Sequence, residues 1–342
     1  YTKEFKHEDA LKKIYESLSL MEEHGTPSDL VKVYYSLGRQ YYNMGEYKKS
    51  IENFLKEIEI KESVNDFRGL VSSHHNLGRT HRTIGNFQLA LEQYQKSLSI
   101  SEKLGDKRLI AANNSEIGLV YENLSRSLLA VEDNEVNFRR ALTFHEAALK
   151  IYQEEQNLDA TAQTLNNIAN TYSRLAINEF VAKYGEFWED SLYQISANVI
   201  MVTFGKAFEY YTEALDVFEQ IDNTREIINT NINLGSHYIF ARNWSKANEH
   251  LGKSLIMARR INSQYEIALA LFHYGDYFFR QKNFENAEQN LLQSLKITES
   301  LGVKDVVMHT NQRLAKVYEQ EGNLQKSLKH FKIYNLIKDE IF

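Results

Sequence analysis

The sequence has no cysteine, a single proline (Pro27) and only 15 glycines among 342 residues. The absence of cysteine excludes disulfides and thiolate metal sites. The scarcity of proline and glycine suits an almost entirely helical chain, because these two residues destabilise helices most. No apolar run approaches the roughly 18 residues that a membrane span needs, and no signal peptide opens the chain. We therefore expect a cytoplasmic, helical protein with no membrane partner.

Charge and size limit the function and architecture further. The formal net charge of −6 argues against general nucleic-acid binding. A chain of 342 residues with 43% hydrophobic content is longer than one compact core usually serves. A solenoid removes that limit, because each of its units packs only on its neighbours.

A small residue recurs along the chain with a basic period of 40 positions. The recurrences are Gly38, Gly78, Gly118, Ala169, Gly235, Gly275 and Ala315. An internal period of this size indicates a repeat architecture before any local motif is considered.

Each unit contains a first helical pattern around its small residue. In the first unit Tyr34, Leu37 and Tyr41 stand four before, one before and three after Gly38, which places one stripe on one helix face. A glycine there costs about 1 kcal/mol of helix propensity. We expect close approach of a second helix to compensate for that cost.

The second pattern supplies this second helix. Another small residue follows after twelve positions in five units, at Ser50, Ala90, Ala247, Ala287 and Ser327. A third small residue usually follows seven positions later, with Glu57 and Tyr334 as exceptions. Small residues where two helices meet predict a close-packed antiparallel helix pair. Gly45, Gly85 and Gly322 are placed in the turn between the helices, where a left-handed residue ends the first.

This pattern resembles the tetratricopeptide repeat, in a 40-residue form rather than the 34-residue one. The matching positions are Tyr34, Leu37, Gly38 and Tyr41 in the first helix and Ala90, Tyr94 and Ser97 in the second. The chain is similar to the arrays of Rap-type regulators, kinesin light chains and bacterial sensor proteins. The resemblance covers nearly all of residues 1–342. It implies an all-α, right-handed superhelical solenoid of antiparallel helix pairs, with seven full repeats and a partial amino-terminal one.

The two ends indicate a fragment of a longer protein. Tyr1 and Ala10 stand forty positions before Tyr41 and Ser50, so we expect the chain to begin part-way through the first helix of an additional repeat. A helical stripe continues to Phe342 at the other end.

Two insertions interrupt the period. The spacing from Gly118 to Ala169 is 51 positions and that from Ala169 to Gly235 is 66. In both units the second-helix pattern reappears late, so the extra segments, at about 124–137 and 178–203, fall between the two helices. Because these turns share one edge of a solenoid, we expect the segments to form one protrusion.

The second insertion is unusually apolar. Its apolar residues at helical spacing include Phe180, Tyr184, Phe187, Trp188, Leu192 and Ile195. They indicate either a hairpin whose apolar faces bury each other or a docking surface, and a homodimer could form there or through the carboxyl-terminal helix.

The sequence offers no support for catalysis, so we predict that the protein is not an enzyme. The histidine-rich stretch "HHNLGRTH" at 74–81 belongs to the first helix of one repeat among seven. In it, His74 and His81 occupy the positions that Tyr34 and Tyr41 hold in the preceding repeat. We interpret them as hydrogen-bonded core groups. No phosphate loop, zinc-protease or nucleophile-elbow motif occurs. No metal and no cofactor are expected.

The resemblance implies that the first helices line a concave groove that binds an extended peptide. The positions three before, two before and one after the small residue face this groove, together with a few flanking side chains. The predicted site comprises Lys32, Tyr35, Arg39, His75, Asn76, Arg79, Arg82, Asn166, Asn167, Asn170, Arg174 and Asn233. Amides both donate and accept hydrogen bonds and so suit a peptide backbone. Guanidinium groups suit carboxylates or phosphates, so an acidic peptide is the favoured ligand.

We expect a non-catalytic peptide- or protein-binding array that forms the regulatory or sensory part of a signalling protein. The alternative is a stand-alone adaptor or scaffold that links partners in a cytoskeletal or motor assembly.

Overall fold

The computed structural model describes residues 2–127, 131–185 and 195–341, and all regular secondary structure in these ranges is helical. The chain divides into two compact units, residues 1–157 and 158–342. The first unit contains α1 (Thr2–His24), α2 (Pro27–Asn43), α3 (Tyr47–Ser63), α4 (Phe67–Thr83), α5 (Phe87–Leu104), α6 (Lys107–Ser127) and α7 (Val131–Glu154). The second contains α8 (Leu158–Tyr184), α10 (Ala197–Thr203), α11 (Gly205–Gln220), α12 (Thr224–Phe240), α13 (Trp244–Arg260), α14 (Gln264–Arg280), α15 (Phe284–Leu301), α16 (Lys304–Gln320) and α17 (Leu324–Ile341).

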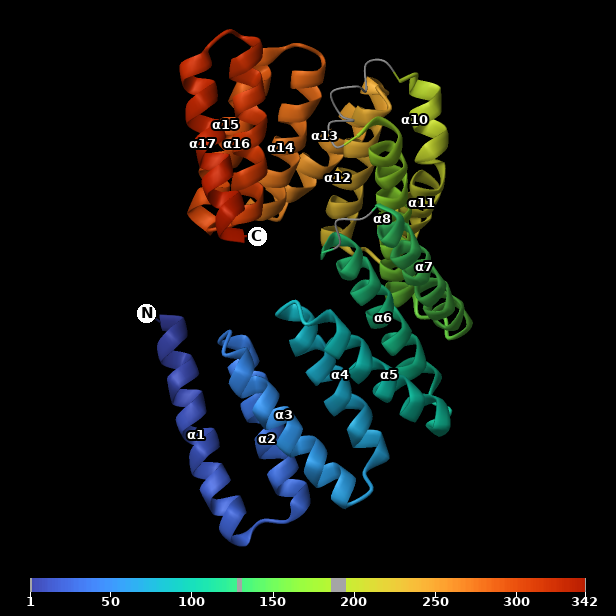
Figure 1. The fold of residues 1–342 in the computed structure, drawn as a ribbon, viewed down its shortest axis with the longest axis vertical. Helices are drawn as coiled ribbons and strands as arrows, with labels where there is room; N and C mark the ends of the chain where they lie inside the picture. Colours follow the sequence, from blue (N-terminus) through green and yellow to red (C-terminus); the bar gives the residue numbers. More distant parts are fainter. Residues whose placement is uncertain (1, 128–130, 186–194, 342) are drawn as a thin grey trace. The chain divides into compact units, whose positions relative to one another are not determined.

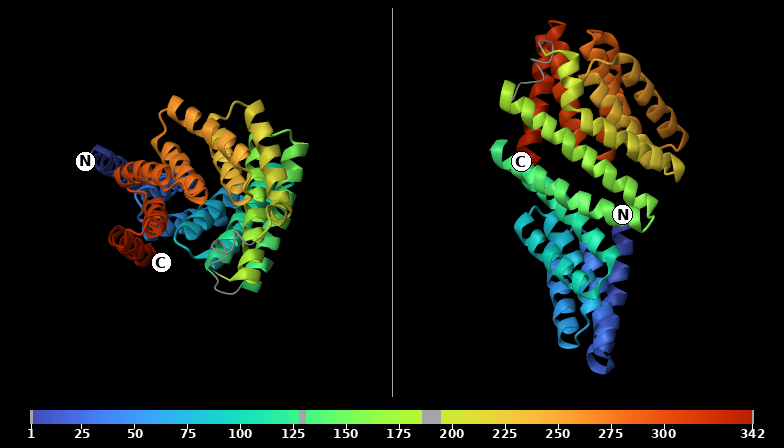
Figure 2. Two further views of the ribbon diagram at one scale, coloured as in Figure 1. Left: turned by 90° about the horizontal axis from the view of Figure 1, so that it is seen from above. Right: turned by 90° about the vertical axis from the view of Figure 1, so that its right-hand side faces the viewer.

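The helices pack as consecutive antiparallel pairs within each unit (Figures 1 and 2). In the first unit α2 packs on α3, α4 on α5 and α6 on α7, and α1 lies against α2. In the second unit the pairs are α8 with α11, α12 with α13, α14 with α15 and α16 with α17. The predicted all-α solenoid of seven helix pairs is confirmed. No helix in the described ranges combines the length and apolarity needed to cross a membrane.

The amino-terminal helix differs from the sequence expectation. Helix α1 runs without a break from Thr2 to His24, whereas the repeat pattern places a turn near residue 5. Phe5 stands forty positions before Gly45, and a phenylalanine does not favour the left-handed conformation that such a turn requires. The partial repeat is therefore one helix and not the end of one helix followed by another.

Left-handed residues separate the helices at both turns of the repeat. Gly45, Gly85 and Gly322 have φ values of 78°, 80° and 78°, which confirms their predicted role. Arg242 and Lys282 take the same position in two other repeats with φ values of 56° and 61°. A second series of left-handed residues ends each second helix but the last, at Asn65, Gly105, Gln156, Asp222, Asn262 and Gly302. A left-handed residue after a helix allows the following backbone N–H groups to donate hydrogen bonds to the last carbonyls of that helix. The helices can therefore end without a proline.

The repeated small residues allow the two helices of a pair to touch. A Cβ atom on Gly38 would lie 2.6 Å from Cε1 of Phe54, whose ring is completely buried. A Cβ atom on Gly235 would lie 2.7 Å from Cδ2 of Leu251. The predicted close approach is confirmed, and packing of the second helix offsets the low helix propensity of glycine.

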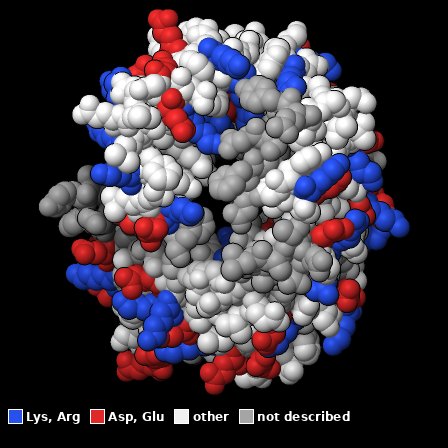
Figure 3. All heavy atoms as spheres, turned by 45° about the horizontal axis from the view of Figure 1, so that its top comes forward, with Lys and Arg blue, Asp and Glu red and all other residues white. Residues whose placement is uncertain are grey.

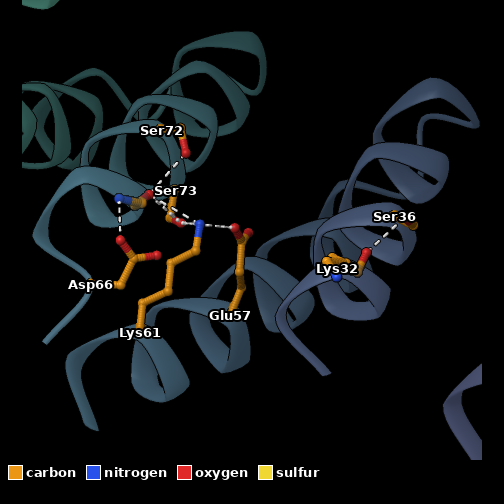
Figure 4. Close-up of polar contacts among 8 residues, drawn as sticks. Lys32, Ser36, Glu57, Lys61, Asp66, Ser72 and Ser73 are labelled. Atoms are coloured by element: carbon orange, nitrogen blue, oxygen red, sulfur yellow. Dashed lines mark hydrogen bonds and ion pairs between the residues drawn. The ribbon is translucent and has the colours of Figure 1, made fainter. Parts of the chain in front are cut away.

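One exception to the small-residue pattern is a buried ion pair. Glu57, which stands where a small residue usually lies, is 1% exposed, and its Oε1 is 2.5 Å from Nζ of Lys61. The Lys61 ammonium also donates to Oγ of Ser73 at 2.8 Å and to the carbonyl of Gly69 at 3.0 Å (Figure 4). A charge can be buried at this seam between α3 and α4 because its partners are buried with it.

A cation–π contact recurs between the two helices of five pairs. The ring three positions after the small residue lies under a cation of the second helix. This cation is in the first turn of the helix in every pair except α6 and α7, where Arg140 lies well inside α7. The pairs are Tyr41–Lys49, Tyr121–Arg140, Tyr172–Lys206, Tyr238–Lys246 and Tyr318–Lys326, with cation-to-centroid distances of 5.4, 5.6, 4.9, 5.1 and 4.6 Å. The remaining two repeats have His81 opposite Leu89 and Phe278 opposite Asn286.

The insertions leave this contact intact. Tyr121–Arg140 and Tyr172–Lys206 span the two inserted segments. Helix α8 runs on to Tyr184, so part of the inserted sequence lengthens a helix. The single protrusion expected from the two insertions would join the two units, and it stays a prediction.

Candidate functional site

Helices α2 and α4 present the predicted basic side chains of the first unit. The guanidinium carbon of Arg39 lies 5.6 Å from the centre of the Tyr35 ring, and that of Arg79 lies 4.7 Å from the Tyr42 ring. Arg39 is exposed and Arg79 is half-buried. Within residues 7–125 and 134–157, whose side chains the structure describes in this unit, neither guanidinium forms an ion pair with a carboxylate. Each cation is thus held by an aromatic face and keeps its charge available for a ligand.

The other two predicted cations have acidic neighbours. Nζ of Lys32 is 3.3 Å from Oδ1 of Asp29, and the two side chains are 73% and 38% exposed. Nη2 of Arg82 is 3.2 Å from Oε2 of Glu116. The basic character expected from four side chains is therefore carried mainly by Arg39 and Arg79. Acidic and basic side chains also lie next to one another over the face drawn in Figure 3.

His75 lies half-buried among these charges. Burial lowers its pKa, and Arg79 and Arg82 act in the same direction, while Glu116 opposes them. Its ring meets the Tyr94 ring edge-on, with 5.4 Å between centroids. A neutral imidazole is expected here at neutral pH, so His75 adds a polar group to the surface without adding charge.

The other two histidines of the stretch are core groups. Nδ1 of His74 is 2.9 Å from Oε1 of Gln93, and both residues are buried. The same contact between first and second helix recurs in two later repeats. It joins Asn231 to His250 at 2.9 Å and Asn311 to His330 at 2.8 Å. The interpretation of His74 as a hydrogen-bonded core residue is confirmed. His81 is buried as predicted, but its Nδ1 has no hydrogen-bond partner among the described residues.

Helices α8 and α12 present the predicted asparagines of the second unit, all of them half-buried. Oδ1 of Asn170 accepts a hydrogen bond from the Tyr211 hydroxyl at 2.6 Å. Oδ1 of Asn166 is buried with no hydrogen-bond partner among the described residues. Asn167 and Asn233 occupy the same position in consecutive repeats, and Asn76 holds it in the first unit. Arg174 is half-buried on α8.

An ion cluster on α14 and α16 was not predicted. Oδ2 of Asp276 is 2.9 Å from Nε of Arg280, and Oδ1 is 3.1 Å from Nη2 of Arg313. Burial alone would raise the pKa of Asp276, but the two arginines hold it below its usual value. The spacing of Asp276 and Arg280, four positions apart on one helix, was the sequence signal that could have revealed the pair.

One pair resembles a nucleophile and its base. Oγ of Ser173 is 2.5 Å from Nε2 of His237, and Nδ1 of His237 is 2.6 Å from the carbonyl oxygen of Asn233. Both side chains are buried, at 6% and 8% exposure, so a substrate cannot reach the serine. Burial also lowers the pKa of His237 to about 4, which makes it a weak base. We interpret the pair as a core hydrogen bond.

The predicted apolar interface is only partly described. Phe180 and Ile195 are buried, at 3% and 5% exposure, and the Phe180 ring stacks on those of Tyr184 and Phe204 at 6.0 Å each. Phe187, Trp188 and Leu192 lie outside the described residues. Phe180 and Ile195 therefore pack within their own unit, whereas Val199 and Val202 of the same segment are exposed. Among the side chains that the structure describes, no three histidine or acidic groups converge as a metal site.

Residues 29–103 match the sequence profile of the tetratricopeptide repeat family. This segment covers the first two helix pairs, which contain the Gly38–Phe54 contact and the left-handed turns at Gly45, Asn65 and Gly85. Residues 29–103 thus carry tetratricopeptide repeats. No curated protein sequence matches the chain.

Several solved structures have a similar fold. RapI in its apo form aligns with a TM-score of 0.67 and 16% identity over 91% of this chain and 98% of RapI. Aspartyl phosphate phosphatase F from Bacillus subtilis aligns with a TM-score of 0.68 and 14% identity over 94% of this chain and 74% of its own. A signal transduction ATPase from Pyrococcus horikoshii with a tetratricopeptide repeat sensor gives 0.64 and 18%, over 89% of this chain and 42% of its own. At these identities the likeness concerns the fold.

Proposed function

We propose that this tetratricopeptide-repeat array is a regulatory domain that binds an extended, acidic peptide or protein segment along its first helices. The observation that carries the proposal is the pair Arg39 and Arg79. They occupy the same position in consecutive repeats, and each lies against a tyrosine ring. Guanidinium groups prepared in this way bind carboxylates strongly, because few rotamers are lost on binding.

The amide side chains supply the second element of the proposal. Asn76 lies one helical turn from Arg79 on α4, and Asn167 and Asn233 repeat its position in the second unit. An amide donates and accepts at once, so each can pair with the backbone of an extended chain whatever its sequence. The arginines would then select acidic side chains.

The regulatory part of the proposal draws on the structural relatives. One similar structure is a Rap protein complexed with Competence and Sporulation Factor, and another is a Rap conjugation gene regulator in complex with the Phr* peptide. We infer by analogy that peptide binding controls an activity or partner of the present chain.

The test is a selection of random peptides displayed on phage against residues 1–342. We expect peptides enriched in Asp and Glu from the wild type. A synthetic peptide of the selected sequence should lose at least about tenfold in affinity for Arg39→Glu with Arg79→Glu, because two favourable charge contacts become repulsive. Helicity and melting temperature should stay near wild type, since Arg39 is exposed and Arg79 half-buried.

A matched control reverses two lysines on second helices of the same unit. Lys48 and Lys103 are exposed near the start of α3 and the end of α5. Their replacement by Glu changes the net charge equally, and its effects on the two helix dipoles are opposite in sign. The control should bind like the wild type. Equal binding by the Arg39/Arg79 variant would refute the proposed site.

A further inference from the structure

The third repeat departs from the asparagine series. The position two before the small residue is Asn76 in the second repeat and Asn167 and Asn233 in the fourth and fifth, but Glu116 in the third between them. Ser36, His273 and Arg313 hold it in the first, sixth and seventh repeats. Glu116 therefore places a carboxylate on α6 where the neighbouring first helix, α4, offers an amide.

Two contacts fix this carboxylate. Its Oε2 lies 3.2 Å from Nη2 of Arg82 and accepts a hydrogen bond from the Tyr94 hydroxyl at 3.0 Å. Tyr94 is fully buried, at 0% exposure, so its hydroxyl is a rigid anchor. Burial and the nearby Glu116 raise the pKa of Tyr94, which keeps the hydroxyl protonated as a donor.

The carboxylate nevertheless remains accessible to a ligand. The Glu116 side chain is 22% exposed and that of Arg82 is 26% exposed. The positive region formed by Arg39 and Arg79 thus ends at an ion pair whose acidic side chain is partly exposed to solvent.

We propose that Glu116 is a specificity-determining residue, an internal carboxylate that occupies Arg82 and excludes an additional acidic group of the ligand from α6. This inference rests on the proposed acidic-peptide function and defines which acidic peptides fit. An acidic group over α2 and α4 meets Arg39 and Arg79. One placed further along, toward α6, meets the Glu116 charge, and a like charge at close range opposes binding.

The test uses the peptide selected on the wild type and a set of derivatives, each with one residue replaced by Glu. In the wild type, a Glu near the end of the peptide that lies toward α6 should weaken binding about tenfold. A Glu at the peptide positions where the selection enriches Asp and Glu should be tolerated. In Glu116→Gln this end-specific loss should disappear or reverse, because the charge is removed while the side-chain length and an acceptor for Tyr94 are kept. Affinity for the parent peptide should change less than about twofold.

A second variant and a control make the outcome decisive. Glu116→Asn introduces the residue of the neighbouring repeats and should give the same change of profile. Glu146→Gln removes an exposed carboxylate from α7 and should leave the profile as in the wild type. If circular dichroism shows that both Glu116 variants are folded and their binding profile equals that of the wild type, the inference about Glu116 is refuted. The proposed function would then still stand. A wild-type selection without acidic peptides would overturn the proposed function and this inference together.

Discussion

Lys206 and Tyr172 are 34 positions apart, yet the ammonium lies 4.9 Å from the ring centre, as close as in repeats where eight positions separate the pair. The contact joins the middle of α8 to the first turn of α11, so it is kept although the inserted sequence separates the two residues along the chain. We expect it to contribute directly to stability. A double-mutant cycle with Tyr172→Leu and Lys206→Met should give a coupling free energy of about 0.5–1 kcal/mol.

The cycle is needed because Lys206 also lies in the first turn of α11, where a positive charge opposes the helix dipole. The single substitution Lys206→Met can therefore be nearly neutral. A coupling free energy near zero in urea unfolding would show that the repeated pairing carries no stability.

Gly235 should tolerate no side chain. A Cβ atom there would lie 2.7 Å from Cγ and Cδ2 of Leu251, whose side chain is fully buried. We expect Gly235→Ala to lower the unfolding free energy by about 1–3 kcal/mol despite the better helix propensity of alanine. Tryptophan fluorescence is a suitable probe, because both tryptophans, Trp188 and Trp244, belong to the second unit.

Gly205, in the same unit, provides the control. Nothing lies within 4 Å of a Cβ atom on that residue, so Gly205→Ala should be neutral or slightly stabilising. The effect of Gly235→Ala should also shrink when Leu251 is already alanine. Equal destabilisation by both glycine substitutions would contradict the packing argument.

Two ion pairs with the same spacing should contribute differently to stability, because one is buried and the other is exposed. Lys61 and Glu57 are 7% and 1% exposed, whereas Lys96 and Glu92 are both 51% exposed, and each pair spans four positions of one helix. Lys61→Met leaves a buried carboxylate without its cation and should cost about 3–5 kcal/mol. Lys96→Met should cost less than about 1 kcal/mol.

The measurement is chemical unfolding followed by far-ultraviolet circular dichroism. Adding Glu57→Leu to Lys61→Met should restore much of the loss, because no uncompensated charge then remains. If the Lys61 and Lys96 variants lose equal stability, the buried network of Figure 4 does not behave as an ion pair.

Acid should destabilise the second unit through His237. Burial lowers its pKa to about 4 from an ordinary 6.5, so between these values the unfolded chain binds a proton that the folded chain does not. The contribution is fully present above pH 6.5 and is lost as the pH falls toward 4. We expect this one group to lower the unfolding free energy by about 2 kcal/mol between pH 7 and pH 5.

His237→Gln should flatten this pH dependence, even if it is less stable at pH 7. His24→Gln, which replaces an exposed histidine, should leave it unchanged. A wild-type slope that persists in His237→Gln would assign the acid sensitivity to other groups, of which the half-buried His273, with a pKa lowered to about 4, is the first to test.

The sequence was most informative at positions where the same packing contact recurs in every repeat. Gly38, Gly235 and their equivalents could be recognised because every helix pair needs the same close contact. His74 could be assigned to the core because tyrosine holds its position elsewhere.

Contacts that occur only once were not predictable in the same way. Glu57 was an anomaly in the pattern until its burial beside Lys61 explained it. The pairing of Arg82 with Glu116 joins α4 to α6, and a period gives the position of a residue but not its rotamer. The sequence alone therefore predicted four cations on the first unit, whereas the pairing of Arg82 with Glu116 required coordinates.

The two helices of a pair come from segments that follow one another in the sequence, and this has a consequence for folding during synthesis. The contacts of α2 with α3 are complete once residue 63 has left the ribosome, before any of the second unit exists. Each later pair needs only the finished surface of the previous one. The nascent chain can thus acquire its structure one hairpin at a time, so a pause in translation would leave a shorter stack of completed hairpins.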